Sequence, residues 1–405
     1  MSRFLQIHTL TSYPASLLNR DDVGFAKRIP FGGVERVRVS SQCLKRHWRT
    51  ADSEHALRRI PVDDGEAPMA IRSRRTFRER LYDPLVAEGV PAEVAAAVCE
   101  ALVGELLPKG KRKKAEPADD GGDAGTADDK FLRTEQVTVI GEPEVDYLRS
   151  LAREIAAGAA DAKSAAKAAV ERIKSDGKNL QTMRLGAGLD AALFGRMITG
   201  DILARCDAAI HVAHSMTVHG GFFETDYFSA VDDLQGPEET GSGHINTSEL
   251  TSGLFYGYAV VDVPLLVSNL QGCPREAWRD ADRGLAAQVV EHVIHLIATV
   301  SPGAKLGSTA PYAHAAMVLA ESGSAQPRTL ANAFLDPVRA RGGLFGEALR
   351  GLGEHLAAMD RMYGRSTARR LAVIAEEPAL LEQVDERLDL PGVARWAAEA
   401  VEKAG

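Results

Sequence analysis

The sequence has few cysteines and no apolar run long enough to cross a membrane. The cysteines lie far apart and form no CxxC pair, which argues against a zinc ribbon and against a disulfide framework: Cys43, Cys99, Cys206 and Cys273. Long apolar stretches such as Tyr258–Val267 are interrupted by Asp262 and Pro264. The N-terminus lacks a basic flank followed by an apolar run, so we expect no signal peptide. A cytoplasmic protein without a membrane partner is the expectation.

Positive charge is missing from one long segment. Between Cys206 and Pro274 there is no Lys or Arg but there are nine acidic residues, a local net charge of −9. Residues 1–80 carry 16 Lys and Arg against 9 Asp and Glu, a local net charge of +7. The overall net charge of −8 therefore does not exclude a nucleic-acid partner, because proteins bind phosphates through local patches. The alternative is that both segments are solvated surfaces of opposite sign.

Recognisable catalytic and cofactor motifs are also missing. There is no Gly-x-Ser-x-Gly motif, and the basic-Gly-aromatic boxes of RNA-recognition domains are absent. Residues 186–191 match the G-x-G-x-x-A dinucleotide pattern, but they follow a polar helix end instead of a buried strand. We expect no catalytic residue and no cofactor.

The histidines do not form an obvious metal site. On a strand, His211 and His219 would face one way and His214 the other, so the three would not converge. His292 and His295 share a predicted helix but lack a third ligand. We therefore expect no metal, and core or capping roles for these side chains.

Strands and helices are mixed without regular βα alternation, which favours an α+β fold. Strands are predicted over Phe4–Leu10, Val34–Val39, Leu189–Met197, Ala208–Val218, Leu254–Val263 and Met317–Ala320. Helices are predicted over 55–108, 144–180, 275–300 and 393–403. Residues 109–130 join a basic block to an acidic, glycine-rich block, and we interpret them as a disordered loop.

A basic helix after the strand Val34–Val39 is the strongest physical signal. Ser40 and Ser41 offer an N-cap. One face is polar and cationic, with Gln42, Lys45, Arg46 and Arg49; the opposite face is apolar, with Leu44 and Trp48. The helix N-terminus and its cations suit contacts to a phosphate backbone, which position a strand without reading its sequence. The alternative is a solvated cationic face.

Longer segments carry a more specific pattern. In chain order they are Leu18-Asn19-Arg20-Asp21-Asp22, Phe31-Gly32-Gly33, Arg36 to Arg46, Ala192-x-x-Gly195-Arg196-Met197, Tyr227 to Leu234, Gly253-Leu254-Phe255-Tyr256 and Pro302-Gly303-Ala304-Lys305. Together they resemble the CasC family, the repeated backbone subunits of type I-E CRISPR Cascade complexes. Residues 109–130 and those past residue 345 match least.

The resemblance implies a modified RNA-recognition-type (ferredoxin-like) palm with a helical fingers insertion and a β-hairpin thumb. The palm would comprise residues 1–54, 181–215 and 253–405. The fingers would comprise 55–180, including the loop 109–130, and the thumb 216–252.

The resemblance also implies an RNA-binding set. By similarity, guide-RNA phosphates and riboses would be held by Asn19, Arg20, Lys27, Arg38, Ser40, Ser41, Gln42, Lys45, Arg46, Arg49 and Lys305. Arg49 stands where the family often has Lys, which keeps the charge. Met197 and Phe228 would flank the point where the thumb interrupts guide pairing and flips a nucleotide outward.

The implied function is a non-catalytic backbone subunit that polymerises head to tail along the guide. Its partners would be the CRISPR guide RNA, target DNA through the guide, other copies of itself and other Cascade subunits. Opposite local charges on one chain suit a heterologous contact of this kind. Two alternatives remain: a metal-dependent RNA nuclease that uses Asp21 or Asp22, as in related type III subunits, and a free-standing binder of single-stranded RNA.

Overall fold

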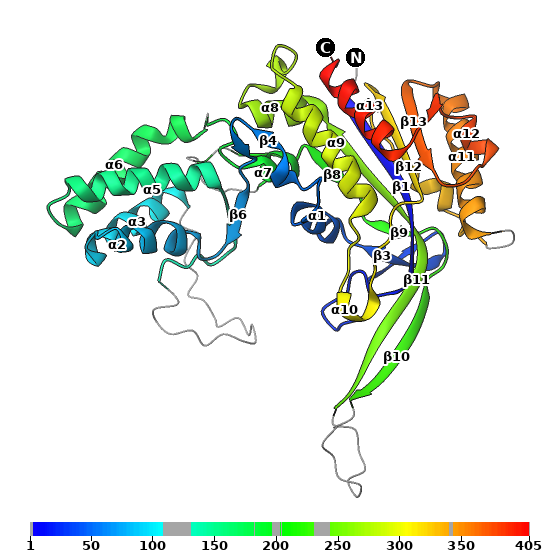
Figure 1. Ribbon diagram of the computed structural model, residues 1–405, viewed down its shortest axis with the longest axis horizontal. Coiled ribbons are helices and arrows are strands. Elements are labelled where there is room, and N and C mark those ends of the chain that lie inside the picture. Colours follow the sequence, from blue (N-terminus) through cyan, green and yellow to red (C-terminus); the bar gives the residue numbers. More distant parts are fainter. Residues whose placement is uncertain are drawn as a thin grey trace, which may run out of the picture. The chain divides into compact units, whose positions relative to one another are not determined.

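The computed structural model describes residues 3–107, 131–181, 183–196, 203, 205–230, 244–339 and 343–404 (Figure 1). The chain divides into two units. We call them the sheet unit (Met1–Leu57, Ile210–Val263 and Arg283–Gly405) and the helical unit (Arg58–Ala209 and Pro264–Asp282). The loop 109–130, expected to be disordered, lies outside the described residues.

The sheet unit is built on one large sheet, which has ten strands among the described residues. Its main path runs β14-β13-β12-β1-β11-β9-β3-β2, and β8 and β10 each pair with β11. All pairs are antiparallel except β13 with β14. The strands are β1 (Phe4–Ser16), β2 (Arg28–Phe31), β3 (Val34–Val39), β8 (Ile210–Val212), β9 (Ser215–Thr217), β10 (Phe222–Ala230), β11 (His244–Asp262), β12 (Met317–Gly323), β13 (Thr367–Val373) and β14 (Glu386–Arg387).

Helices cover both faces of this sheet. Because side chains alternate along a strand, odd-numbered residues of β1 such as Ile7 line a cavity of about 40 Å³ beneath α1 and α9, while Leu10 packs against α11 and α12. β1 is therefore buried without a break from Leu5 to Thr11, although several of these side chains are polar. The helices of this unit are α1 (Ser41–Arg49), α9 (Gly284–Thr299), α10 (Leu306–Thr309), η4 (Ala331–Phe334), α11 (Leu344–Tyr363), α12 (Pro378–Leu381) and α13 (Leu390–Glu402).

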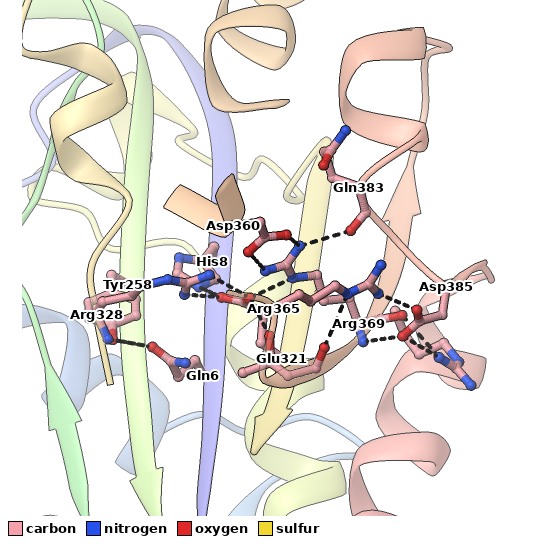
Figure 2. A network of polar contacts seen from close by, with 12 residues as sticks. Gln6, His8, Tyr258, Glu321, Arg328, Asp360, Arg365, Arg369, Gln383 and Asp385 are labelled. Carbon is pink, nitrogen blue, oxygen red and sulfur yellow. Dashed lines mark hydrogen bonds and ion pairs between the residues drawn. The ribbon is translucent and has the colours of Figure 1, made fainter. Parts of the chain in front are cut away.

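A buried polar network lies on the α11 side of the sheet (Figure 2). The Glu321 carboxylate, on β12, accepts hydrogen bonds from Arg328 at 2.7 and 3.0 Å and from Arg369 Nε at 2.8 Å. Arg369 in turn donates to both oxygens of Asp360, on α11, at 2.6 and 2.7 Å. The two most buried charges, Glu321 and Arg369, are thus each paired with two opposite charges, which offsets the cost of burying them.

His8 joins this network in a defined tautomer. Its Nε2 lies 3.0 Å from Glu321, which can only accept while ionised, so Nε2 carries the proton. Nδ1 therefore accepts from the Tyr256 hydroxyl at 2.8 Å, and that hydroxyl oxygen accepts from the Leu330 amide at 3.0 Å. Burial lowers the pKa of His8; it would raise that of Glu321, but bonds from His8 and Arg328 outweigh it and hold the Glu321 pKa well below its usual range.

The helical unit has its own apolar core. Residues of α3, α5 and α6 form most of it, with Phe77, Leu81 and Leu85 from the segment before α3. Its elements are η1 (Leu57–Arg59), β4 (Pro61–Val62), β5 (Gly65–Glu66), β6 (Ala70–Ser73), the π-helix η2 (Arg78–Tyr82), α2 (Asp83–Ala87), α3 (Ala92–Leu106), β7 (Thr138–Gly141), α5 (Glu142–Gly158), α6 (Ala162–Gln181), α7 (Leu189–Phe194), α8 (Val263–Gln271) and η3 (Arg275–Ala277).

Three predicted elements are wrong. Residues 55–108 are not helical throughout, because the strands β4, β5 and β6 precede α2 and α3. Residues 189–194 form helix α7 instead of a strand, because five successive buried residues do not distinguish a short strand from a buried helix. Residues 275–300 do not form one helix: after η3 the chain turns, and α9 begins only at Gly284. The strands predicted at Phe4, Val34, Leu254 and Met317 are confirmed, as is the C-terminal helix.

The glycine pattern at 186–191 has a packing explanation. Gly188 has φ +88° and caps α7, and a Cβ there would lie 2.5 Å from the Ala70 nitrogen. Two residues on, the Asp190 carboxylate accepts from the same Ala70 amide at 2.7 Å. Gly188 therefore allows α7 to dock on β6.

The α+β class is confirmed, whereas the division into palm, fingers and thumb stays a prediction. The helical unit contains 58–180 from the expected fingers, and also 181–209 and 264–282 from the expected palm. These segments are joined within it, because the Asn269 side-chain amide donates to the carbonyls of Ala192 and Asp207. Among the described helices, none combines the length and apolarity of a membrane span.

Replacing Glu321 by Ala should destabilise the sheet unit by roughly 3–5 kcal/mol, because it leaves buried Arg369 short of a partner and His8 without its acceptor. Chemical denaturation measures the loss. Glu399→Ala removes an exposed carboxylate paired with Lys403 and should leave the unfolding midpoint unchanged. Equal midpoints for both variants would contradict the role given to the network.

Candidate nucleic-acid interface

Helix α1 forms as the sequence predicts. The Ser40 hydroxyl accepts from the Cys43 amide at 3.3 Å and so caps the helix. Leu44 and Trp48 are buried, whereas Gln42 and Arg46 are exposed and Lys45 and Arg49 half-buried. The first turn contains no acidic residue, and Arg46, His47 and Arg49 occupy the last. The outer face of α1 is therefore cationic along its length.

Asn19 ties the preceding loop to α1. Its side-chain oxygen accepts from the Ser40 amide at 3.0 Å, and its carbonyl accepts from the Lys27 amide at 2.9 Å. The Lys27 carbonyl then accepts from the Arg38 amide at 2.8 Å. Asn19 thus accepts hydrogen bonds from two backbone amides, and these bonds fix both the start of α1 and the position of Lys27.

Lys305 reaches the same end of the sheet from a distant segment. The preceding residue, Ala304, forms a β-bridge with Leu17. Lys305 has φ +55°, in the left-handed region, and its carbonyl accepts from Ser308 at 3.0 Å and Thr309 at 3.2 Å. The backbone of Lys305 is thus held by the following turn, one residue from the bridge to Leu17 and close to the loop that carries Asn19.

Arg38 has a partner that the sequence reasoning missed. Its Nη1 lies 2.9 Å from Nδ1 of His214, and its Nε donates to the Arg28 carbonyl at 3.1 Å. Burial first, and then the charges of Arg38 and Lys27, lower the pKa of His214. The sequence gives no indication of this contact, because two residues 176 positions apart leave no local signal.

The base of the β10–β11 hairpin is fastened to the same loop. Glu249, on β11, is buried and pairs with Arg28, and it also accepts from the Ala26 amide at 2.8 Å. The Arg28 guanidinium stacks on the Phe223 ring of β10, 3.7 Å from its centroid. One acid of the cation-free segment is thus neutralised by the basic N-terminal segment of the same chain.

Beyond this base the hairpin extends past the rest of the sheet (Figure 1). Phe228 pairs with Asn246 in the ladder, six residues or about 20 Å along β10 from Phe222. Phe222 and Tyr227 are exposed. Phe228 thus lies away from the anchored base of the hairpin, and Met197 lies outside the described residues.

Asp21 serves the loop itself. Its carboxylate accepts from the Phe25 amide at 2.8 Å, and the two residues also share a backbone hydrogen bond of 2.8 Å. Asp22 is exposed next to it, and Arg20 bridges to Ala26. The contacts of Asp21 are those of a turn anchor.

The remaining histidines are partnered in other ways. Buried His219 contacts the Gly220 carbonyl through Nδ1 and accepts from the Leu254 amide through Nε2. His55 stacks on His295, with ring centroids 3.7 Å apart, and burial followed by the His55 and His292 charges lowers the His295 pKa to about 4. No three His, Cys, Asp or Glu side chains in the described residues could hold a metal ion together.

Apart from Arg20, which bridges to Ala26 in the loop, the predicted cations of the sheet unit lie toward one end of the sheet: Lys27, Arg38, Lys45, Arg46, Arg49 and Lys305. We call this group the cationic platform. Four of these cations come from β3 and α1, and the other two come from two separate loops. The arrangement can hold several successive phosphates without contacting base edges.

Comparison with known proteins gives three findings. The family model described as CT1975-like protein matches residues 5–396. A chain of a "CRISPR RNA-guided surveillance complex, pre-nicking" is similar to it with 27% identity and a TM-score of 0.76, covering 98% of this chain and 100% of that chain. A chain of a "CRISPR RNA-guided surveillance complex" shares the fold at 23% identity and a TM-score of 0.68, with 98% and 99% coverage. No curated protein matches the sequence.

Replacing Glu249 by Ala should loosen the hairpin base, because the Ala26 amide and Arg28 lose their shared acceptor. We expect a cost of about 2–4 kcal/mol. Hydrogen exchange should show faster exchange of the Ala26 amide and of the amides that pair β10 with β11. Glu224→Ala, on the exposed face of β10, is the matched control. Equal exchange in both variants would show that the hairpin does not depend on this anchor.

Proposed function

The chain belongs to the CT1975-like protein family, and we propose that it is a backbone subunit of a CRISPR surveillance complex that holds guide RNA on the cationic platform. The assignment to the CasC-type backbone proteins made from the sequence is confirmed. Binding of guide RNA and the identity of the residues that hold it are the steps we add.

The observation that carries the proposal is the convergence of the platform on α1. Three separate segments are joined near this cationic helix by hydrogen bonds to backbone amides and by one β-bridge. They carry Asn19 with Lys27, Ser40, and Lys305. A solvated cationic face would need no such fastening. The full-length similarity to chains of RNA-guided complexes supports RNA as the polyanion.

The chemistry of the platform favours a sequence-independent role. Lys and Arg side chains and the N-terminus of α1 suit phosphates, which are the same in every nucleotide. A subunit that carries any guide must hold the backbone and leave the base edges to pair with the target. Target DNA would then be recognised through the guide.

We further propose the type I-E arrangement that the sequence resemblance implies. The β10–β11 hairpin would be the thumb, with Phe228 and Met197 flanking a flipped nucleotide. Copies would associate head to tail along the guide, and other Cascade subunits would end the row. The exposed aromatics Phe222 and Tyr227 support an apolar role for the hairpin, since residues 216–252 contain no Lys or Arg.

The chain would be non-catalytic. The alternative nuclease needs a carboxylate presented to a metal and a substrate, whereas Asp21 is engaged with the Phe25 amide. Asp22 alone would have to supply the ligand set in that loop. A structural role for both carboxylates is the simpler account.

Replacing Lys45 and Arg49 together by Ala should weaken RNA retention for all guide sequences alike. Each phosphate contact releases about one counterion, so the slope of log K against log salt should fall by about two. Filter binding at several salt concentrations measures this. Arg350→Ala with Arg361→Ala removes the same charge from α11, on the other face of the sheet, and should change neither value. Loss confined to particular guides would mean that α1 reads bases.

Complementary RNA incubated with the assembled complex and Mg²⁺ or Mn²⁺ should remain intact. Denaturing gels of end-labelled target provide the readout, and heat-denatured complex gives the background. Cleavage that disappears in Asp22→Ala, or in Asp21→Ala with the fold retained, would establish the nuclease alternative.

A further inference from the structure

His214 lies in the turn between β8 and β9, next to the cationic platform but outside the predicted RNA-binding set. It is exposed, and its Nδ1 is 2.9 Å from Nη1 of Arg38. Lys27 is near enough to influence its charge, and the backbone of Lys27 is bonded to Arg38. Two cations and an imidazole therefore meet at the edge where β3 pairs with β9.

The contact with Arg38 fixes the tautomer of His214. A guanidinium can only donate hydrogen bonds, so Nδ1 of His214 must be the acceptor. The neutral ring then carries its proton on Nε2, which remains a donor. Arg38 is itself held in place, because its Nε donates to the Arg28 carbonyl at 3.1 Å.

An anion would reduce the positive charge around this ring. Without one, burial and the positive charges of Lys27 and Arg38 all favour the neutral imidazole. A phosphodiester between the three side chains carries one negative charge, so it would offset part of this positive charge and accept a hydrogen bond from the ring, and both effects favour the imidazolium. Protonation places a hydrogen on Nδ1, so the bond from Arg38 must open, and both groups can then donate to phosphate oxygens.

We propose that His214, Arg38 and Lys27 form a phosphodiester-binding subsite in which His214 takes up one proton from solvent when RNA binds. The inference rests on the proposed function, since it adds a residue and a pH dependence to the same platform. Through linkage, affinity should rise as pH falls, starting at the His214 pKa of the RNA-bound state and ending at the lower pKa of the free state.

Substituting His214 by Gln and by Ala separates the effect of its hydrogen-bond donor from the effect of its positive charge. Gln keeps an amide donor near the position of Nε2 but cannot be protonated, whereas Ala removes both. His214→Ala should bind single-stranded RNA several-fold more weakly than the wild type at about pH 8 and about tenfold more weakly near pH 5.5. His214→Gln should match the wild type at the higher pH and fall behind it only at the lower.

His211→Gln is the matched control, because His211 is an exposed histidine on β8, three residues away. The full-length chain and a mixed-sequence single-stranded RNA are the reagents. NMR titration of the imidazole signals provides a second readout: the His214 pKa should rise when RNA is added, while that of His211 should not. Wild-type pH dependence in His214→Gln, or an unchanged His214 pKa, would overturn the subsite.

The outcomes also distinguish this inference from the function on which it rests. If the His214 variants bind like the wild type while the Lys45 and Arg49 double variant does not, the platform stands and the subsite falls. If neither the wild type nor His211→Gln retains RNA at any pH, the proposed function itself falls.

Discussion

The burial of β1 on both of its faces is the constraint on which the rest of the sheet unit depends. β1 pairs with β11 on one side and β12 on the other, and it separates the space beneath α1 and α9 from the core under α11. Its even-numbered side chains point to the α11 side, where His8 joins the polar network (Figure 2). Just after its end, Leu17 forms the bridge to Ala304, and Asn19 bonds to the Ser40 amide at the start of α1. The candidate RNA surface is thus positioned by a strand that is buried on both faces, and a rigid strand suits a surface that must hold a ligand in a fixed position.

Much of this arrangement could be predicted from the sequence, because it rests on local patterns. The alternation of Val34–Val39, the Ser40 cap and the Leu44–Trp48 stripe specify a strand followed by a one-sided helix, and both are present. What could not be predicted depends on distant partners. Arg36 and Arg38 look equivalent on β3, yet Arg36 is buried and donates to the carbonyls of Phe31, Thr217 and Phe334, while Arg38 faces His214. The pairing of Arg28 with Glu249 likewise spans 221 residues.

The uneven charge of the chain has an internal use as well as an external one. The sequence suggested that the cation-free segment meets the basic segment of a neighbouring copy. Within one chain, Glu249 already joins the two, and Arg28 is thereby withdrawn from the free cations of the surface. The charge left for phosphates is carried by α1, Lys27, Arg38 and Lys305. A local net charge therefore overstates what a surface offers to a ligand, because buried pairs must first be subtracted.

His8 and His214 show how the same side chain is made unresponsive or responsive. Both are neutral, and in both a neighbour fixes the tautomer with the proton on Nε2. His8 is enclosed, and both of its ring nitrogens have protein partners, so a proton could be added only by breaking its bond with Tyr256 in the core. His214 is exposed, and the cations beside it are the groups that a phosphate would neutralise. A histidine can couple proton uptake to binding when two conditions are met. Its ring must be exposed to the ligand, and its protonation must be suppressed by charges that the ligand offsets.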